Sequence, residues 1–214
     1  MLSDLQCAEL CVGIYGYSGE PTVSWDHLEL PQTDDGICWG LKRLDGYDVF
    51  VLRGSATIED WWRDFDFIGE LDTHPVLGDV HAGFFDGMPE AWSAMQALLQ
   101  QPLVITGHSL GAGRAAIVAG LAIASGVVPV RRIVFGEPKP GFQQLADLLS
   151  NVPAASYRNG NDISHDPVTD VPIGLKYVHP SALTDVSAQP PVLDPWGPLA
   201  WHHMQLYRDA LKSG

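Results

Sequence analysis

The chain has 214 residues, a formal net charge of −14 at pH 7 and a sequence pI near 4.7. This length suffices for one substantial hydrophobic core but is short for two, so we expect a single domain over residues 1–214. The acidic composition offers no basic stripe to neutralise phosphates, which argues against a nucleic-acid partner and against docking on anionic lipid. No run approaches the ~20 apolar residues that a membrane-spanning helix needs, so stable membrane insertion is not expected.

The first fifty residues carry the patterns of a helix and a strand pair. Apolar residues recur at helical spacing over residues 2–12, and a glycine-containing stretch at 13–19 ends that helix. Two β-rich runs follow at 37–41 and 47–52, and the Asp-Gly pair at 45–46 between them is a strong hairpin signal. These patterns predict an amphipathic N-terminal helix followed by a β-hairpin.

Strands and helices alternate through the rest of the chain. We expect helices at residues 89–101, 110–125, 142–150 and 201–212, and strands at residues 102–106, 132–136 and 154–158. This βαβαβ order predicts an α/β fold, in which a mostly parallel central sheet has helices on both faces. Two long stretches without clear periodicity, at 159–173 and 181–196, are expected to be functional loops.

The cysteines and the N-terminal residues bear on metal binding and on the compartment. Cys7, Cys11 and Cys38 form an odd set without a CxxC pair or a matching histidine spacing, which predicts neither a disulfide framework nor a metal site. We expect buried thiols in a reducing compartment. Residues 1–10 contain acids instead of a basic region and have no long apolar run. These residues lack the pattern of a signal peptide, so we expect a cytoplasmic location. Export by another route is the alternative.

The most informative motif is Gly-x-Ser-x-Gly at residues 107–111. It follows the short apolar run at 102–106 and precedes an alanine-rich segment at 110–125, which together supply the strand, turn and helix of a nucleophile elbow. Such an elbow presents the serine hydroxyl to a base, and the flanking glycines let neighbouring backbone approach without a side-chain clash. Ser109 is therefore predicted to be a nucleophile. The alternative is a glycine-rich turn that contains an incidental serine.

A hydrolase with this elbow needs an acid and then a histidine later in the chain. His202 and His203 open the last predicted helix, and from there one imidazole could remove the serine proton and return it to the leaving alcohol. Either histidine could instead be an exposed residue at the start of a helix. The acid would orient the imidazole. Three aspartates after the strand at 154–158 compete for that role, namely Asp162, Asp166 and Asp170.

Further motifs accompany the elbow in order along the chain. They are Phe-Val-Leu-Arg-Gly-Ser at 50–55, Trp-Trp-Arg-Asp at 61–64, Val-His-Ala-Gly-Phe at 80–84, Gly-His-Ser-Leu-Gly-Ala-Gly at 107–113 and Phe-Gly-Glu-Pro-Lys-Pro-Gly at 135–141. With these segments the chain resembles the class 3 lipase family, the fungal-type triacylglycerol lipases, from residue 49 onward. The resemblance implies an α/β-hydrolase-like fold and an ester hydrolase that needs no metal or organic cofactor.

The same resemblance implies roles for residues at the elbow. Ser109 would be the nucleophile. The backbone N–H of Leu110, together with the N–H and hydroxyl of Ser55, would form the oxyanion hole. Loss of one such donor typically costs about 2.7–4 kcal/mol of transition-state stabilisation. Ser55 as a simple turn residue is the alternative.

The resemblance also assigns the acid and the base. The family's acid sits in an Asp-x-Val pattern with a proline several residues later, which Asp166 fits. Asp162, which lies nearer the end of the preceding strand, stays an alternative. The family's histidine is followed five residues later by a tyrosine, as His202 is followed by Tyr207. His203 would need a shifted helix register.

Residues 56–68 resemble the amphipathic lid of this family and contain several tryptophans and phenylalanines. Aromatic side chains of this kind suit a transient contact with a lipid interface. The same side chains could instead pack on the core of the protein, which is the commoner fate of an aromatic stripe. The segment is therefore a candidate lid with a structural alternative.

Together these patterns predict a serine carboxylic-ester hydrolase, a lipase or esterase that acts through an acyl-enzyme intermediate on lipid or short-chain esters. Phospholipase A1 or galactolipase activity at the same triad is one alternative. A catalytically inactive hydrolase fold that serves as a binding module is the other. That module would lack a member of the triad, whereas Ser109, Asp166 and His202 are all present.

Overall fold

The computed structural model describes residues 2–30, 37–55, 70–174, 176–191, 194 and 197–213. The strands are β1 (His27–Glu29), β2 (Trp39–Leu44), β3 (Tyr47–Leu52), β4 (Leu71–His74), β5 (Gly78–His81), β6 (Leu103–His108), β7 (Arg131–Phe135), β8 (Ala154–Asn159) and β9 (Leu183–Val186). The helices are α1 (Asp4–Tyr15), α3 (Ala82–Phe85), α4 (Met88–Leu98), α5 (Leu110–Ala124), α6 (Gln143–Leu149) and α7 (Met204–Ser213), with 3₁₀ helices η1 (Pro167–Asp170) and η2 (Gly197–His202).

A seven-stranded sheet forms the centre of the described part of the chain, in the order β1-β2-β3-β6-β7-β8-β9. The strands from β3 to β9 pair in parallel, whereas β2 pairs antiparallel with both β1 and β3. Strands β4 and β5 form a separate antiparallel hairpin. The mostly parallel sheet expected from the βαβαβ order is therefore confirmed.

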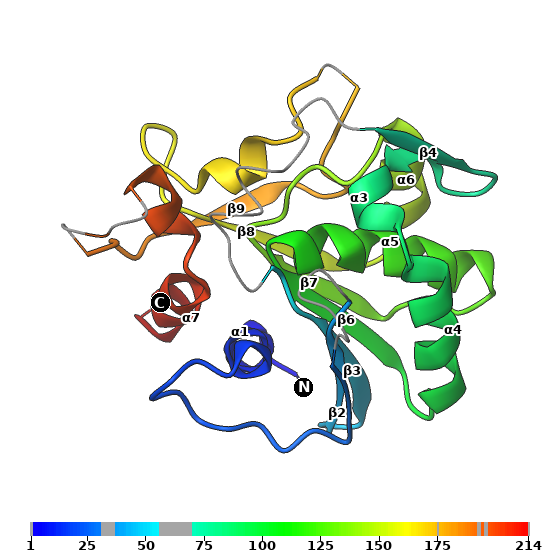
Figure 1. Cartoon of the computed structure of the whole chain (residues 1–214), viewed down its shortest axis with the longest axis horizontal. Coiled ribbons are helices and arrows are strands. Elements are labelled where there is room, and N and C mark those ends of the chain that lie inside the picture. The colour runs from blue at the N-terminus through cyan, green and yellow to red at the C-terminus, as the bar shows by residue number, and fades with distance from the viewer. Residues whose placement is uncertain are drawn as a thin grey trace.

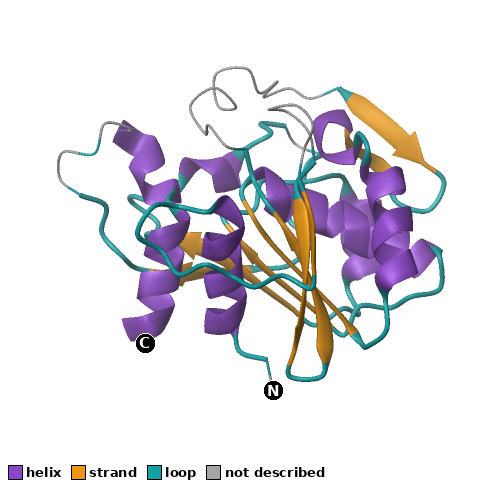
Figure 2. Cartoon of the chain, turned by 60° about the horizontal axis from the view of Figure 1, so that its bottom comes forward, coloured by secondary structure: helices purple, strands orange, loops and turns teal. Residues whose placement is uncertain are grey.

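Helices cover both faces of this sheet, as the sequence predicts. Helices α1 and α7 lie on one face, and α3, α4, α5 and α6 lie on the other (Figure 1; the strands run between the two groups in Figure 2). Strand β3 is buried on both sides: Val49 and Val51 belong to the cluster around α1 and α7, whereas Phe50 and Leu52 belong to the cluster around α4 and α5. Burial on both faces explains why this strand is apolar throughout its second half.

The parallel register brings the ends of four strands to one edge of the sheet. Leu52 at the end of β3 pairs with Gly107 in β6, and His108 at the end of β6 pairs with Phe135 at the end of β7. Strand β8 pairs in parallel with β7 and ends at Asn159. The segments that follow these strands therefore start at the same edge, where ligands of open α/β sheets bind.

The N-terminal helix is longer than the sequence pattern predicts. It begins with a capping box in which Ser3 and Gln6 satisfy each other's backbone N–H groups, and it continues through Gly13 to Tyr15. A Cβ atom on Gly13 would lie 2.2 Å from the Cγ2 atom of Val23, so glycine at this position lets Val23 pack directly against the helix. Tyr15 is part of the last turn of α1.

The predicted hairpin is present, whereas several short strands were not predicted from the sequence. Asp45 and Gly46 both have positive φ, 52° and 83°, and join β2 to β3 as the Asp-Gly signal predicts. The sequence analysis did not predict β1, the β4–β5 hairpin or β9, which lies inside the expected loop at 181–196. Strands β1, β4 and β9 have three or four residues each and are largely exposed, so they lack the buried apolar run that marks a strand. Strand β5 is mostly buried, but its four residues are too few to form such a run.

The helix expected at 201–212 begins later than predicted. His202 ends the 3₁₀ helix η2, and α7 begins only at Met204. The carbonyl oxygen of His202 accepts a hydrogen bond from the ring of His108 instead of from a helical N–H group. The prediction that His202 opens an α-helix is therefore wrong, and the tertiary contact of its backbone explains the difference.

The three cysteines are buried and free, as the sequence analysis expects. Burial raises the pKa of the Cys11 thiol to about 12, so this group is a neutral thiol at pH 7 and not a nucleophile. Within the described ranges, no group of three or more His, Cys, Asp or Glu residues is arranged to hold a metal ion. No helix among these residues is long and apolar enough to cross a membrane.

Candidate active site

Ser109 occupies a sharp turn between β6 and α5. Its backbone has φ 61° and ψ −131°, a conformation that L-residues rarely adopt and that costs of the order of 1–3 kcal/mol. The backbone N–H of Ser109 donates to the carbonyl oxygen of Phe135 at 3.0 Å, which ties the turn to the end of β7. A strained serine held between a strand and a helix is the geometry of a nucleophile elbow.

The two glycines of the motif are required by close backbone contacts. A Cβ atom on Gly107 would lie 2.4 Å from the carbonyl oxygen of Gly111. A Cβ atom on Gly111 would lie 2.1 Å from the carbonyl oxygen of Leu52, the last residue of β3. Neither position has space for a side chain. The Gly-x-Ser-x-Gly pattern therefore reflects packing of the elbow against itself and against β3.

Asp166 and His202 form a buried pair at this edge of the sheet. The Nδ1 atom of His202 lies 2.5 Å from Oδ2 of Asp166, and both side chains are at most 1 % exposed. The hydroxyl of Tyr207 donates to the same carboxylate oxygen, and the backbone N–H of Val168 donates to Oδ1 at 2.9 Å. The carboxylate thus accepts three hydrogen bonds, which fixes its position and offsets part of the cost of burying its charge.

Glycine at position 136 makes room for this pair. Gly136 follows β7 with φ +56°, and a Cβ atom there would lie 2.7 Å from both Oδ2 of Asp166 and Cε1 of His202. Any larger residue would push the acid and the base apart. The glycine therefore allows the end of β7 to pass directly beside the two side chains.

Two buried polar atoms of the site have no hydrogen-bond partner among the described residues. They are the Oγ atom of Ser109 and the Nε2 atom of His202. The ring of His108, the neighbour of Ser109, stacks on the ring of His202 with centroids 4.5 Å apart, so the imidazole lies beside the elbow. Buried polar groups normally have partners, and unpaired ones are common where a substrate or a reaction supplies the partner. These are the two atoms between which a catalytic triad transfers a proton.

Two segments that carry backbone N–H groups lie next to Ser109. Leu110 is the first residue of α5, so its N–H has no acceptor within the helix and lies at the positive end of the helix dipole. The segment that carries Ser55 passes close to the nucleophile, since a Cβ atom on Gly54 would lie 2.8 Å from Cβ of Ser109. The positions expected for the oxyanion donors are therefore next to the elbow.

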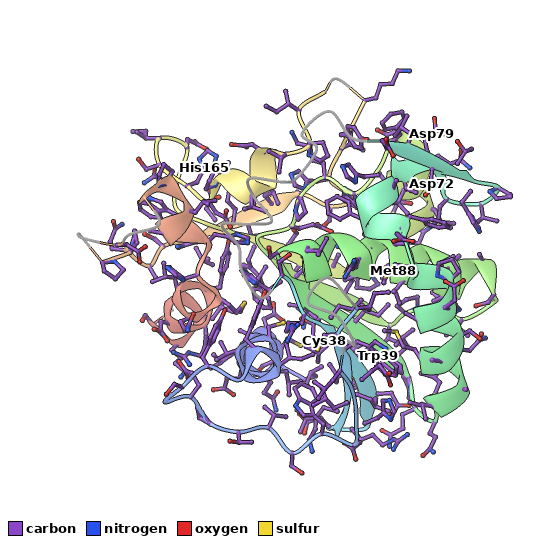
Figure 3. The ribbon with its side chains drawn as sticks, viewed as in Figure 1. Cys38, Trp39, Asp72, Asp79, Met88 and His165 are labelled. Carbon is purple, nitrogen blue, oxygen red and sulfur yellow. The ribbon has the colours of Figure 1, made fainter. Side chains whose placement is uncertain are left out.

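The other sequence candidates have different partners. Asp162 is 95 % exposed and pairs with Arg158 at 3.2 Å. Asp170, the last residue of η1, pairs at 3.0 Å with His165, which precedes η1 (His165 is labelled in Figure 3). His203 pairs with Asp194 at 3.0 Å. The structure thus brings Asp166, and neither of the other two aspartates, into contact with His202. The expected lid at 56–68 lies outside the described residues.

Comparison with known proteins identifies the family. A family model described as Lipase (class 3) matches residues 49–175, more than half of the chain. The chain belongs to the class 3 lipase family. Its relatives include the phospholipase A1-II 1 of Oryza sativa subsp. japonica, which is 33 % identical over 219 residues that cover 86 % of this chain and 54 % of the relative. The secreted mono- and diacylglycerol lipase 1 of Fusarium solani is 30 % identical over 145 residues, with 62 % of this chain and 42 % of the relative covered.

Solved structures confirm the α/β-hydrolase fold of this class 3 lipase family member. The mono- and diacylglycerol lipase from Aspergillus oryzae has a TM-score of 0.67 and is 18 % identical, with 89 % of this chain and 82 % of that chain covered. At this identity the likeness concerns the fold alone. The chain spans about half the length of the curated relatives it matches.

The comparisons also correct the expected location. Fungal relatives of this class 3 lipase family member are named as secreted lipases, which contradicts the cytoplasmic location predicted from residues 1–10 and from the cysteines. The cysteine argument failed for a physical reason. Cys7, Cys11 and Cys38 are each buried in the core, where a free thiol behaves as a small apolar side chain in either redox environment.

Three contacts of the site were not predicted from the sequence. The spacing between His202 and Tyr207 was noted, but not that the tyrosine hydroxyl contacts the acid. The Tyr207 hydroxyl keeps its proton and acts as the donor, because burial and then the charge of Asp166 raise the pKa of Tyr207 well above its ordinary value. The close approach of Gly136 and the contact of Tyr15 with His108 were also missed. The Phe-Gly pair at 135–136 could have indicated the close approach of Gly136 to the site. Nothing in the helical pattern of residues 2–12 indicated a contact of Tyr15 with His108.

Proposed function

We propose that this chain hydrolyses carboxylic esters of lipids or short-chain esters through an acyl-enzyme intermediate, with Ser109 as nucleophile, His202 as base and Asp166 as acid. One observation carries the proposal. Asp166 holds Nδ1 of the buried His202, while Nε2 of His202 and Oγ of Ser109 have no other partner among the described residues. This arrangement leaves the base and the nucleophile available to each other and to a substrate.

In the acylation step, Oγ of Ser109 attacks the ester carbonyl carbon while Nε2 of His202 removes the hydroxyl proton. The carbonyl oxygen becomes an oxyanion, which would accept hydrogen bonds from the N–H of Leu110 and from the N–H and hydroxyl of Ser55. Collapse of the tetrahedral intermediate breaks the bond to the alcohol, which leaves with the proton from His202. The acyl group stays on Ser109.

In the deacylation step, a water molecule attacks the acyl carbon and His202 takes its proton. The same donors stabilise the second oxyanion, and the carboxylic acid leaves as Oγ of Ser109 regains the proton. The buried Asp166 stabilises the imidazolium that forms in each half of the cycle and keeps the proton of the neutral ring on Nδ1. Neither step calls for a metal or an organic cofactor.

The substrate class is inferred from the relatives and from the charge. The family and the names of the fungal relatives support esters of acylglycerols. A second candidate is phospholipase A1 activity, because a relative of that name matches 86 % of this chain. The net charge of −14 favours neutral or zwitterionic lipids over anionic ones. The single domain over residues 1–214 and the lipid contact of residues 56–68 stay predictions.

The proposal is tested with Ser109→Ala, because this change removes only the nucleophilic oxygen. Hydrolysis of p-nitrophenyl butyrate is expected to fall to the background rate while the far-UV circular dichroism spectrum stays the same. Ser164→Ala, at an exposed loop position, is the matched control and should keep full activity. Activity retained in Ser109→Ala would refute the proposed nucleophile. A wild-type chain without activity on any ester would favour the inactive binding module.

A panel of esters separates the two activities. Mono-, di- and triacylglycerols are compared with phosphatidylcholine, each dispersed in the same detergent, and the released fatty acid is titrated. Faster release from acylglycerols supports the lipase. Faster release from phosphatidylcholine, with a lysophospholipid that has lost its sn-1 chain, supports the phospholipase A1.

A further inference from the structure

The ring of His108, the residue before Ser109, makes two hydrogen bonds, one to the backbone of His202 and one to Tyr15. Its Nε2 atom lies 2.8 Å from the carbonyl oxygen of His202, and its Nδ1 atom lies 2.8 Å from the hydroxyl oxygen of Tyr15. A carbonyl oxygen can only accept, so Nε2 carries the proton. In the neutral ring Nδ1 is then an acceptor, and the Tyr15 hydroxyl must be its donor. The two contacts together select a single tautomer of His108.

The ring of His108 stays neutral in this environment. Burial, and then the proximity of His202, lower the pKa of His108 well below its ordinary value. Besides Tyr15 and His202, the groups that face this ring are the aromatic ring of Tyr207, with centroids 5.9 Å apart, and the more distant His203. A neutral ring stacked on His202 avoids placing a second positive charge beside the imidazolium that forms in catalysis. Deprotonation at Nδ1 is also what the hydrogen bond from Tyr15 requires.

Tyr15 joins this arrangement to the segment that carries Ser55. A Cβ atom on Gly54 would lie 2.3 Å from the hydroxyl oxygen of Tyr15, so the phenol lies directly against the backbone of that segment. Burial raises the pKa of Tyr15 well above its ordinary value, so the phenol remains a donor. The ring stacks on Tyr17 with centroids 4.9 Å apart and planes 8° apart, which holds the phenol in place.

We propose that Tyr15 and His108 are positioning residues for the base. Tyr15 donates to Nδ1 of His108, and Nε2 of His108 donates to the carbonyl of His202, which fixes the backbone of His202 at the point where η2 ends. The close contact of the same phenol with Gly54 places the expected oxyanion segment next to this arrangement. This role rests on the proposed function of His202. Tyr15 lies on α1, outside the residues 49–175 that match the family model.

The test in the full-length chain is Tyr15→Phe, which keeps the ring and its stacking on Tyr17 and removes only the hydroxyl. Tyr17→Phe is the matched control, because it makes the same change two residues away on a hydroxyl that does not contact His108. We expect kcat on p-nitrophenyl butyrate to fall about tenfold in Tyr15→Phe, with KM changed less than twofold, because misplacement of a base slows the chemical step. Tyr17→Phe should retain the wild-type kcat. Equal kcat in the two variants would overturn the proposal.

A double-mutant cycle separates positioning through His108 from a general loss of structure. His108→Leu removes both contacts of the ring, so adding Tyr15→Phe to it is expected to cause less than a twofold further loss of kcat. If the fold-losses of kcat in the two single variants multiply in the double variant, Tyr15 acts independently of His108, which contradicts the proposal.

A measurement that does not depend on turnover distinguishes a failure of this inference from a failure of the proposed function. Nitrogen-15 NMR of the histidine rings at pH 7 should show His108 as the Nε2–H tautomer in the wild-type chain and in Tyr17→Phe. In Tyr15→Phe, signals of a tautomer mixture or a faster-exchanging Nε2 proton are expected. An Nδ1–H tautomer in the wild-type chain, or an unchanged spectrum in Tyr15→Phe, would refute the positioning. Lack of ester hydrolysis by the wild-type chain would instead refute the proposed function.

Discussion

Two histidine–aspartate pairs on one side of this sheet share the same chemistry and differ in their surroundings. His202 and Asp166 are at most 1 % exposed, whereas the side chains of His165 and Asp170 are 20 % and 62 % exposed. Both ring nitrogens of His165 have partners, since Nδ1 contacts the carbonyl oxygen of Asn161 and Nε2 contacts Asp170. In His202, Nδ1 contacts Asp166, while Nε2 has no partner among the residues that the structure describes. The His202–Asp166 pair therefore combines burial with an unpaired second nitrogen, the two features that the proposed catalysis requires, and the His165–Asp170 pair has neither.

The largest expected effect separates the two pairs directly. Asp166→Asn should lower kcat by about 10⁴-fold, the loss typical of a triad acid replaced by its amide, because the amide selects the wrong tautomer of His202. Asp170→Asn makes the same change in the exposed pair and should alter kcat less than twofold. Both variants are assayed on p-nitrophenyl butyrate. A large loss in Asp170→Asn, or in Asp162→Asn, with little loss in Asp166→Asn would show that the acid is assigned to the wrong residue.

The space beside the buried pair can be removed with Gly136→Ala. The new methyl group would lie 2.7 Å from both Asp166 and His202, so we expect kcat/KM to fall about 100-fold as the two side chains separate. Gly126→Ala is the matched control, because Gly126 also has positive φ, +85°, but nothing lies within 4 Å of its Cβ position.

Both glycine variants should lose stability in thermal unfolding through the same backbone strain. Only Gly136→Ala should lose activity. Full activity in Gly136→Ala would mean that the contact of Asp166 with His202 is not needed for turnover.

A smaller effect is expected from the second donor to the acid. Tyr207→Phe removes the hydroxyl that donates to Oδ2 of Asp166 and should lower the unfolding free energy by about 1.5–3 kcal/mol and kcat about tenfold. Tyr157→Phe removes a tyrosine–aspartate contact with a different acid, Asp4, while it keeps the ring that stacks on Phe135, and should leave kcat unchanged. Urea unfolding and initial rates provide the two measurements. If both variants behave alike, the Tyr207 contact has no role in orienting the acid.

The smallest effect concerns the pH dependence of stability. The pKa of His108 is lowered in the folded chain, so the unfolded chain binds a proton below about pH 6.5 that the folded chain does not bind. The unfolding free energy should therefore fall as the pH decreases below 6.5, by up to about 1.4 kcal/mol per pH unit from this group. His108→Gln should remove that part of the slope in urea unfolding at pH 7.0, 6.0 and 5.5. An identical slope in the variant would show that His108 does not resist protonation.

The parts of the fold that were predictable have strong local signals. The hairpin between β2 and β3 follows from an Asp-Gly pair, and the strands and helices around Ser109 follow from apolar runs and an alanine-rich segment. Strands β1, β4 and β9 were not predicted because they are short and largely exposed, and β5 because it has only four residues; hydrogen bonding to neighbouring strands decides their conformation. The start of α7 was misplaced because a tertiary contact takes the carbonyl of His202 out of the helical pattern.

The sequence singled out a candidate nucleophile and a candidate base, but it could not show which aspartate is buried against the base. The motif and the resemblance singled out Ser109, and the spacing to Tyr207 favoured His202 over its neighbour. The Asp-x-Val pattern favoured Asp166 but left Asp162 open, because burial and partners distinguish the two aspartates and both depend on the folded chain. Tyr15 could not be found at all, since 93 residues separate it from His108 in the sequence.

The most direct test of the central claim is covalent labelling of the nucleophile. The wild-type chain is incubated with a fluorophosphonate probe, digested and analysed by mass spectrometry. A single phosphonate adduct is expected on the peptide that contains Ser109, with labelling slowed strongly in Asp166→Asn and unchanged in Asp170→Asn. Absence of an adduct, or an adduct on a different serine, would contradict the account.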